Sequence, residues 1–144
     1  MLVVEKRERG MVDFGHNGAV ATLRDIIIDS RHPASLARFW AAILDDYEIA
    51  PYDEAELERL RGEGIDSPED DPTVALVPGS GGPRIWFQLV PESKVVKNRV
   101  HLDIDGDHEP ILALGATVSA EHDHWLTLLD PEGNEFCVFP LNTD

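Results

Sequence analysis

The sequence predicts an α+β fold made of two similar halves, each running strand, helix and then three strands. Two observations lead to this prediction. Each half begins with a short stretch that alternates polar and apolar residues, the pattern of a strand with one buried face. Each of these stretches precedes residues with helical spacing and then short strand-like segments separated by turns. Because repeated units can bury one shared core, the repeat predicts that the two halves pack together.

The first half begins with an isoleucine-rich strand predicted at residues 24–29. Pro33 lies where a helix commonly starts. The helix after it has its apolar residues at amphipathic spacing: Leu36, Phe39, Trp40, Ile43 and Leu44. The other elements predicted here are a strand at 47–51, a polar helix at 53–61, and strands at 74–77 and 84–90 around a glycine-rich turn at 79–83.

The second half begins with an alternating stretch at residues 97–105, which predicts a strand over 99–105. A helix is predicted at 109–114 and ends at Gly115. Three strands are predicted after it, at 117–120, 125–129 and 135–139, with a turn at 130–134 before the last.

The length and apolar content predict one globular domain, since 144 residues with 42% hydrophobic side chains can bury a core. We expect an N-terminal extension over residues 1–20 and a domain over 21–144. Within the domain, the first half spans 21–92 and the second 97–141.

Composition also indicates which kinds of partner and environment the protein has. A net charge of −16 argues against nucleic acid, whose phosphates attract cationic surfaces. No apolar run is long enough to predict a membrane span. Cys137 is the single cysteine, so no internal disulfide forms, and this fits a reducing cytoplasm.

His101 is the leading functional candidate. The alternation over 97–105 places it on one strand face with Lys97, Arg99, Asp103 and Asp105. Lys97 and Arg99 are expected to receive a carboxylate or another anion of a small ligand. The structural alternatives are a histidine that only satisfies local hydrogen bonds, and basic side chains that pair with surface acids.

Three stretches, residues 32–40, 86–103 and 130–136, carry a family resemblance. With the order of elements, they resemble the vicinal oxygen chelate superfamily, which includes glyoxalase I, extradiol dioxygenases and bleomycin-resistance proteins. The closer resemblance is to the glyoxalase-like domain of bacterial, often actinobacterial, proteins. It implies two βαβββ modules that form a curved mixed sheet, with helices on the convex side and a divalent metal in the concave side. It also implies a homodimer.

Carried over by position, the metal ligands of that superfamily fall on Asp25, Gln88, His101 and Cys137. Asp25 replaces a usual His or Gln, and Cys137 replaces a usual Glu. The resemblance makes His101 and Asp25 the catalytic candidates, with a carboxylate as base. A mixed set of this kind suits Zn, Ni, Mn or Fe, and a thiolate favours Zn.

Each of these residues also has a structural interpretation. Cys137 can be a small core residue, Asp25 can pair with Arg24 or Arg99, and Gln88 can bind a ligand without metal. Strand parity places further side chains on the candidate face, and we expect them to line a ligand pocket: Trp86, Trp125 and Thr127. Core or dimer packing is the alternative for the tryptophans. The tract 122–124 (His-Asp-His) is a weaker metal candidate in a predicted turn.

Two functions remain open from the sequence. One is a metal-dependent lyase, isomerase or dioxygenase acting on a small molecule. The other is a metal-free protein that binds or sequesters a ligand, in the manner of bleomycin-resistance proteins, and needs no cofactor. A third hypothesis is a regulatory or accessory domain that acts through a partner.

Overall fold

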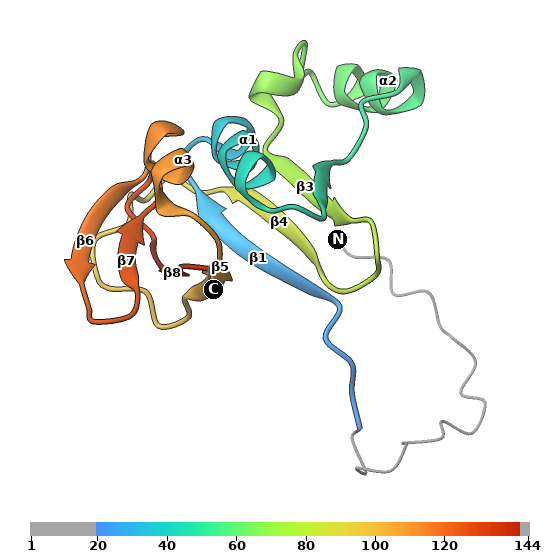
Figure 1. Cartoon of the computed structure of the whole chain (residues 1–144). Helices are drawn as coiled ribbons and strands as arrows, with labels where there is room; N and C mark the ends of the chain where they lie inside the picture. The colour runs from blue at the N-terminus through green and yellow to red at the C-terminus, as the bar shows by residue number, and fades with distance from the viewer. Residues whose placement is uncertain (1–19, 142–144) are drawn as a thin grey trace.

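A computed structural model describes residues 20–141, so the predicted extension lies outside the described residues apart from residue 20. The prediction of two βαβββ modules is confirmed, and each module forms its own four-stranded mixed sheet (Figure 1). The first module contains β1 (Asp25–Ser30), α1 (Pro33–Ile43), β2 (Tyr47–Ile49), α2 (Glu54–Gly62), a 3-10 turn (Pro68–Asp70), β3 (Thr73–Pro78) and β4 (Arg84–Leu89). The second contains β5 (Leu102–Asp105), α3 (His108–Ala113), β6 (Thr117–Glu121), β7 (Leu126–Leu129) and β8 (Glu135–Phe139).

Both sheets have the same topology, which establishes the internal repeat. The strand order is β1-β4-β3-β2 in the first module and β5-β8-β7-β6 in the second. In each sheet the first and last strands of the module pair in parallel, and the other ladders are antiparallel. Figure 1 shows the two modules side by side, with α2 over the outer part of the first.

The amphipathic helix α1 builds the core that both modules share. Its apolar positions Leu36, Ala37, Phe39 and Trp40 are all buried, because helical spacing gathers them on one face. The ring centroids of Trp40 and Phe136, a residue of β8, lie 4.9 Å apart with their planes at 63°. The helix of the first module thus packs directly on the second module's sheet, so the two modules have one core.

Two carboxylates in the turn before β8, those of Asp130 and Glu132, accept hydrogen bonds from the first module. The indole Nε1 of Trp40 donates to Asp130. Helix α1 has no capping side chain at its own N-terminus. Instead, the Glu132 carboxylate accepts hydrogen bonds from the hydroxyl of Ser30 and from the backbone N–H groups of Arg31 and His32. An anion at a helix N-terminus satisfies N–H groups that have no helical partner.

Most boundaries lie within one or two residues of the sequence prediction, and the largest difference is at the start of β5. The strand expected at residues 99–105 begins only at Leu102. The ladder with β8 begins at the pair Leu102–Phe136, and the segment before it is anchored at Asn98, whose N–H donates to the Glu135 carboxylate at 2.9 Å. His101 therefore directly precedes β5. Within the described residues, no helix has the length and apolar character that a membrane crossing requires.

Candidate functional site

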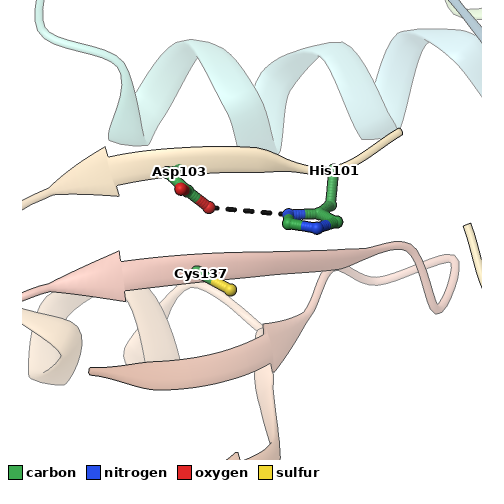
Figure 2. Close-up of side chains that lie close together, drawn as sticks. All are labelled: His101, Asp103 and Cys137. Atoms are coloured by element: carbon green, nitrogen blue, oxygen red, sulfur yellow. Dashed lines mark ion pairs between the residues drawn. The ribbon is translucent and has the colours of Figure 1, made fainter. Parts of the chain in front are cut away.

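Three side chains, from the residue before β5, from β5 and from β8, meet on the face of the second sheet that points away from the helices. A nitrogen of His101, an oxygen of Asp103 and the sulfur of Cys137 all lie within 4.8 Å of one another. Figure 2 shows these side chains directed toward the same space. Within residues 20–141 they form the one group of three or more His, Cys, Asp or Glu side chains that is arranged to hold a metal ion.

Strand geometry explains the convergence. His101 and Asp103 are two residues apart, so they share one face, while Leu102 and Ile104 pack toward the core. The parallel register of β5 and β8 then places Cys137 directly beside Asp103. Phe136 and Val138 flank the cysteine and are buried, so the thiol must face the opposite side.

The cluster is accessible to a ligand. The side chains of His101 and Asp103 are 44% and 57% exposed, and Nδ1 of His101 lies 3.5 Å from Oδ1 of Asp103. Cys137 is half-buried, so it is not the fully buried core residue that was one interpretation of the sequence. Asp103, which the sequence analysis placed on the same strand face as His101, thus belongs to the same group of donor atoms as His101 and Cys137.

Asp25 and Gln88 lie elsewhere in the first module. The Asp25 carboxylate is 14% exposed and accepts two hydrogen bonds from Arg84, at 3.0 and 3.2 Å. It also lies 3.4 Å from Arg24, one of the two partners expected from the sequence. In the β1–β4 register Asp25 pairs with Arg84, whereas Gln88 pairs with Asp29. Four register positions, about 13 Å, separate the two side chains along the sheet. Metal ligation by either residue stays a prediction.

The register also shows why the two modules differ. In the second module Cys137 pairs with Asp103, which lies two positions after His101. The equivalent first-module position, two residues after Asp25, is Ile27, and its partner is Trp86. Trp86 therefore occupies the place that corresponds to Cys137. An indole has no lone pair suited to a metal. Trp86 instead packs against the Arg84 guanidinium, which lies 5.4 Å from its ring centroid.

A second group of predicted site residues lies next to the cysteine. Thr127 is the cross-strand partner of Cys137, and its Oγ1 is 3.7 Å from the sulfur. His122 Nε2 lies 3.0 Å from the same hydroxyl. Trp125 stacks between His122 and Phe139, with centroid distances of 4.5 and 5.7 Å. The sequence analysis places His122 in a candidate metal-binding tract within a predicted turn. Its contact with Thr127 depends on the conformation of that turn, which no residue pattern specifies.

A cavity of about 640 Å³ lies between the two modules, and of the three cluster residues His101 lines it, whereas Asp103 and Cys137 do not. Its wall includes His101 and Arg99 from the second module and Ile27 and Asp29 from the first. This size is within the range of small-molecule sites. Lys97, also expected to bind a ligand, is exposed and its ammonium donates to the backbone oxygen of Asn98 at 3.3 Å.

The carboxylates on the cavity wall are largely held by other groups. Burial works against ionisation of Glu135, but hydrogen bonds from the Asn98 N–H and the Lys94 ammonium outweigh it and lower the pKa of Glu135 to about 2. Glu132 is engaged by the start of α1. Glu132 and Glu135 therefore stabilise the cavity wall, whereas His101, on the same wall, has its Nδ1 3.5 Å from Asp103 of the cluster.

The donor set of the cluster suits a divalent ion. Neutral imidazole, carboxylate and thiolate together carry a charge of about −2, which a dication balances. Ligands of a tetrahedral zinc ion lie about 3.4–3.7 Å apart, given bonds of about 2.0–2.3 Å. The 3.5 Å between His101 and Asp103 already has this value. Three protein ligands leave one coordination position for a substrate.

Two βαβββ modules, each with a mixed sheet, and a metal-type cluster beside a cavity define a protein of the vicinal oxygen chelate type. The glyoxalase-like domain family matches residues 25–139, and the chain belongs to that family.

Solved structures agree in fold. A glyoxalase/bleomycin resistance protein/dioxygenase family enzyme from Burkholderia phytofirmans is 21% identical, with a TM-score of 0.55, over 85% of this chain and 100% of that one. The fosfomycin resistance protein FosX from Mesorhizobium loti is 11% identical, with a TM-score of 0.58, over 84% and 92%. A glyoxalase/dioxygenase from Nostoc punctiforme is 14% identical, with a TM-score of 0.55, over 88% and 95%. A search among curated proteins gives no match.

Proposed function

We propose that this domain binds a divalent metal, preferentially zinc, through His101, Asp103 and Cys137, and acts as a lyase or isomerase on a small molecule held in the cavity between the modules. The observation that carries the proposal is the mutual approach of the three donor groups within 4.8 Å. Zinc is favoured because it accepts imidazole, carboxylate and thiolate together. Zinc has no redox chemistry, so a lyase or isomerase is favoured over a dioxygenase.

When bound, the ion supplies a Lewis acid that polarises an oxygen of the substrate. The residues of the chain have separate tasks. His101 lies on the cavity wall, so a substrate in the cavity approaches the cluster from the side of this ring. Arg99 lines the same cavity and is suited to orient a carboxylate or another acceptor of the substrate. Hence the proposed site has a reactive end at the cluster and a binding end between the modules.

Calorimetric titration of chelator-treated protein with Zn²⁺ tests the proposal. We expect one ion per chain and a loss of affinity of about tenfold or more in each of three variants, His101→Asn, Asp103→Asn and Cys137→Ser. His108→Asn is the matched control, because this half-exposed histidine at the start of α3 is outside the cluster and its loss leaves the affinity unchanged. Absence of saturable binding, or binding equally strong in all the variants, contradicts the metal site.

A metal-free ligand-binding protein is the second candidate, and the cavity favours it. Its volume of about 640 Å³ and its mixed wall of isoleucine, arginine and asparagine suit a small organic molecule without any ion. A thermal-shift screen of small carboxylates and aromatic metabolites, in the presence of EDTA, separates the two functions. A ligand that raises the melting temperature equally with and without EDTA supports the second function.

A further inference from the structure

Cys137 has a hydroxyl group beside it on the neighbouring strand. Thr127 and Cys137 are paired residues of the antiparallel β7–β8 ladder, and Thr127 Oγ1 lies 3.7 Å from the sulfur. Sulfur is a large atom, so this separation is within the range of a hydrogen bond to a thiol or thiolate. A threonine hydroxyl has one proton to donate and two lone pairs that accept. Its orientation therefore depends on what else it contacts.

His122 is that other contact. Its Nε2 lies 3.0 Å from Thr127 Oγ1. The ring is held in place, because it stacks on Trp125 at 4.5 Å with an angle of 19° between the planes. The backbone N–H of His122 also donates to the carbonyl of Trp125 at 3.0 Å, which closes the turn between β6 and β7. The imidazole thus approaches the hydroxyl from a defined direction.

We infer that His122 and Thr127 form a hydrogen-bonded chain that donates to the thiolate of Cys137 and positions it as a metal ligand. In this arrangement Nε2–H of His122 donates to Thr127 Oγ1, and the hydroxyl proton of Thr127 points at the sulfur. The inference rests on the proposed metal site. It assigns Thr127 and His122 as positioning residues that contact the ligand cysteine or its partner, with no direct contact to the ion.

The hydrogen bond from Thr127 to Cys137 has a measurable effect on the electronic spectrum of a bound metal ion. A hydrogen bond to a metal-bound thiolate stabilises the sulfur lone pairs, so more energy is needed to transfer charge from sulfur to the metal. Outer contacts of this kind also hold the ligand in position, and their loss typically weakens metal binding by about 10–100-fold. Co²⁺ substitutes for Zn²⁺ and gives a sulfur-to-metal charge-transfer band in the near ultraviolet, which makes both effects observable.

The test compares Co²⁺-loaded full-length wild type with Thr127→Val, Thr127→Ser and His122→Phe. Valine has the shape of threonine without its donor, serine restores the donor, and phenylalanine keeps the stack on Trp125. We expect the charge-transfer band to move to lower energy in Thr127→Val, and by less in His122→Phe, while Thr127→Ser resembles wild type. The affinity for Co²⁺ falls by about tenfold or more in Thr127→Val. Thr117→Val on β6 is the control and leaves the band and the affinity unchanged.

The outcomes separate the two proposals. A charge-transfer band in wild type that is identical in energy and affinity in Thr127→Val overturns the inference and leaves the metal site intact. A wild type without any such band, or with a band that survives Cys137→Ser, overturns the proposed metal site and the inference with it. Circular dichroism and the melting temperature of each variant establish that a spectral change arises in a folded protein.

Discussion

Trp40 Nε1 donates a hydrogen bond of 3.1 Å to Oδ2 of Asp130, and both residues are buried although 90 positions separate them in sequence. The other oxygen of Asp130 accepts from the backbone N–H groups of Glu132 and Asn134 at 2.9 and 3.0 Å. One carboxylate thus shapes the turn before β8 and fastens it to helix α1. The wall of the cavity between the modules includes both residues.

Replacing Trp40 by Phe tests this connection. The ring remains apolar, but Oδ2 of Asp130 loses one of its two donors and keeps only the amide of Asn134 at 2.9 Å. A hydrogen bond to a charged group contributes about 1.5–3 kcal/mol. We expect a fall of that size in the free energy of unfolding, measured by urea denaturation, with a further contribution from lost volume. Arg38→Gln on the exposed face of α1 is the control, since its partner Glu69 is a surface residue. An equal fall in both variants contradicts a special role for the indole donor.

Glu132→Gln tests the long-range cap of α1. The amide retains the size and one acceptor oxygen but loses the negative charge that faces the N–H groups of Arg31 and His32. We expect the free energy of unfolding to fall by about 0.5–2 kcal/mol, the usual range for a lost cap. Glu58→Gln on α2 is the matched control: Glu58 is exposed and makes no ion pair within the described part of the chain. If the two variants are equally stable, Glu132 does not stabilise the helix.

Glu135 gives the fold a dependence on acidic pH. The pKa of Glu135 is about 2 in the folded state, and that of an unfolded glutamate is about 4.3. Between these values the unfolded chain binds more protons, so stability from this carboxylate is present above about pH 4.3 and is lost as the pH falls toward 2. Partial exposure to solvent screens the interaction, and we expect on the order of 1–2 kcal/mol.

Urea denaturation of wild type and Glu135→Gln between pH 2 and pH 6 measures this contribution. The difference in free energy of unfolding is expected to be largest at pH 6 and to decrease toward zero at pH 2. A difference that stays constant with pH indicates that the substitution acts through packing. Glu58→Gln supplies the reference, with the same change of charge on an exposed helix surface.

Local sequence patterns were sufficient for most elements of the fold. The isoleucine run of β1 and the amphipathic spacing of α1 predicted both correctly, because period and propensity are local properties. The start of β5 was predicted three residues early. Its alternating pattern continues into residues 99–101, but a strand also needs a paired neighbour, and the pairing with β8 begins only at Leu102. The boundary of β5 therefore depends on strand pairing, which the alternation of polar and apolar residues does not specify.

The candidate site depended on register, which the sequence leaves open. His101 and Asp103 share a face by parity, so their proximity follows from the pattern alone. The approach of Cys137 follows from the β5–β8 pairing, which the sequence suggested only through the family resemblance. Gln88 illustrates the difficulty, because it lies two positions beyond Trp86, the residue that corresponds to Cys137 in the first module. A shift of two residues preserves the face but moves a side chain by about 7 Å along the strand.

Asp25→Asn tests whether the first module supplies a metal ligand. The Asp25 carboxylate is occupied by Arg84 and Arg24, so ligation requires at least the Arg84 contact to break. We expect Asp25→Asn to lower the free energy of unfolding by about 1 kcal/mol and to leave the affinity for Zn²⁺ within about twofold of wild type. Calorimetric titration alongside Cys137→Ser gives the comparison. If Asp25→Asn weakens zinc binding as much as Cys137→Ser, the first module must close toward His101 when metal binds, and Arg84 must release Asp25 in that step.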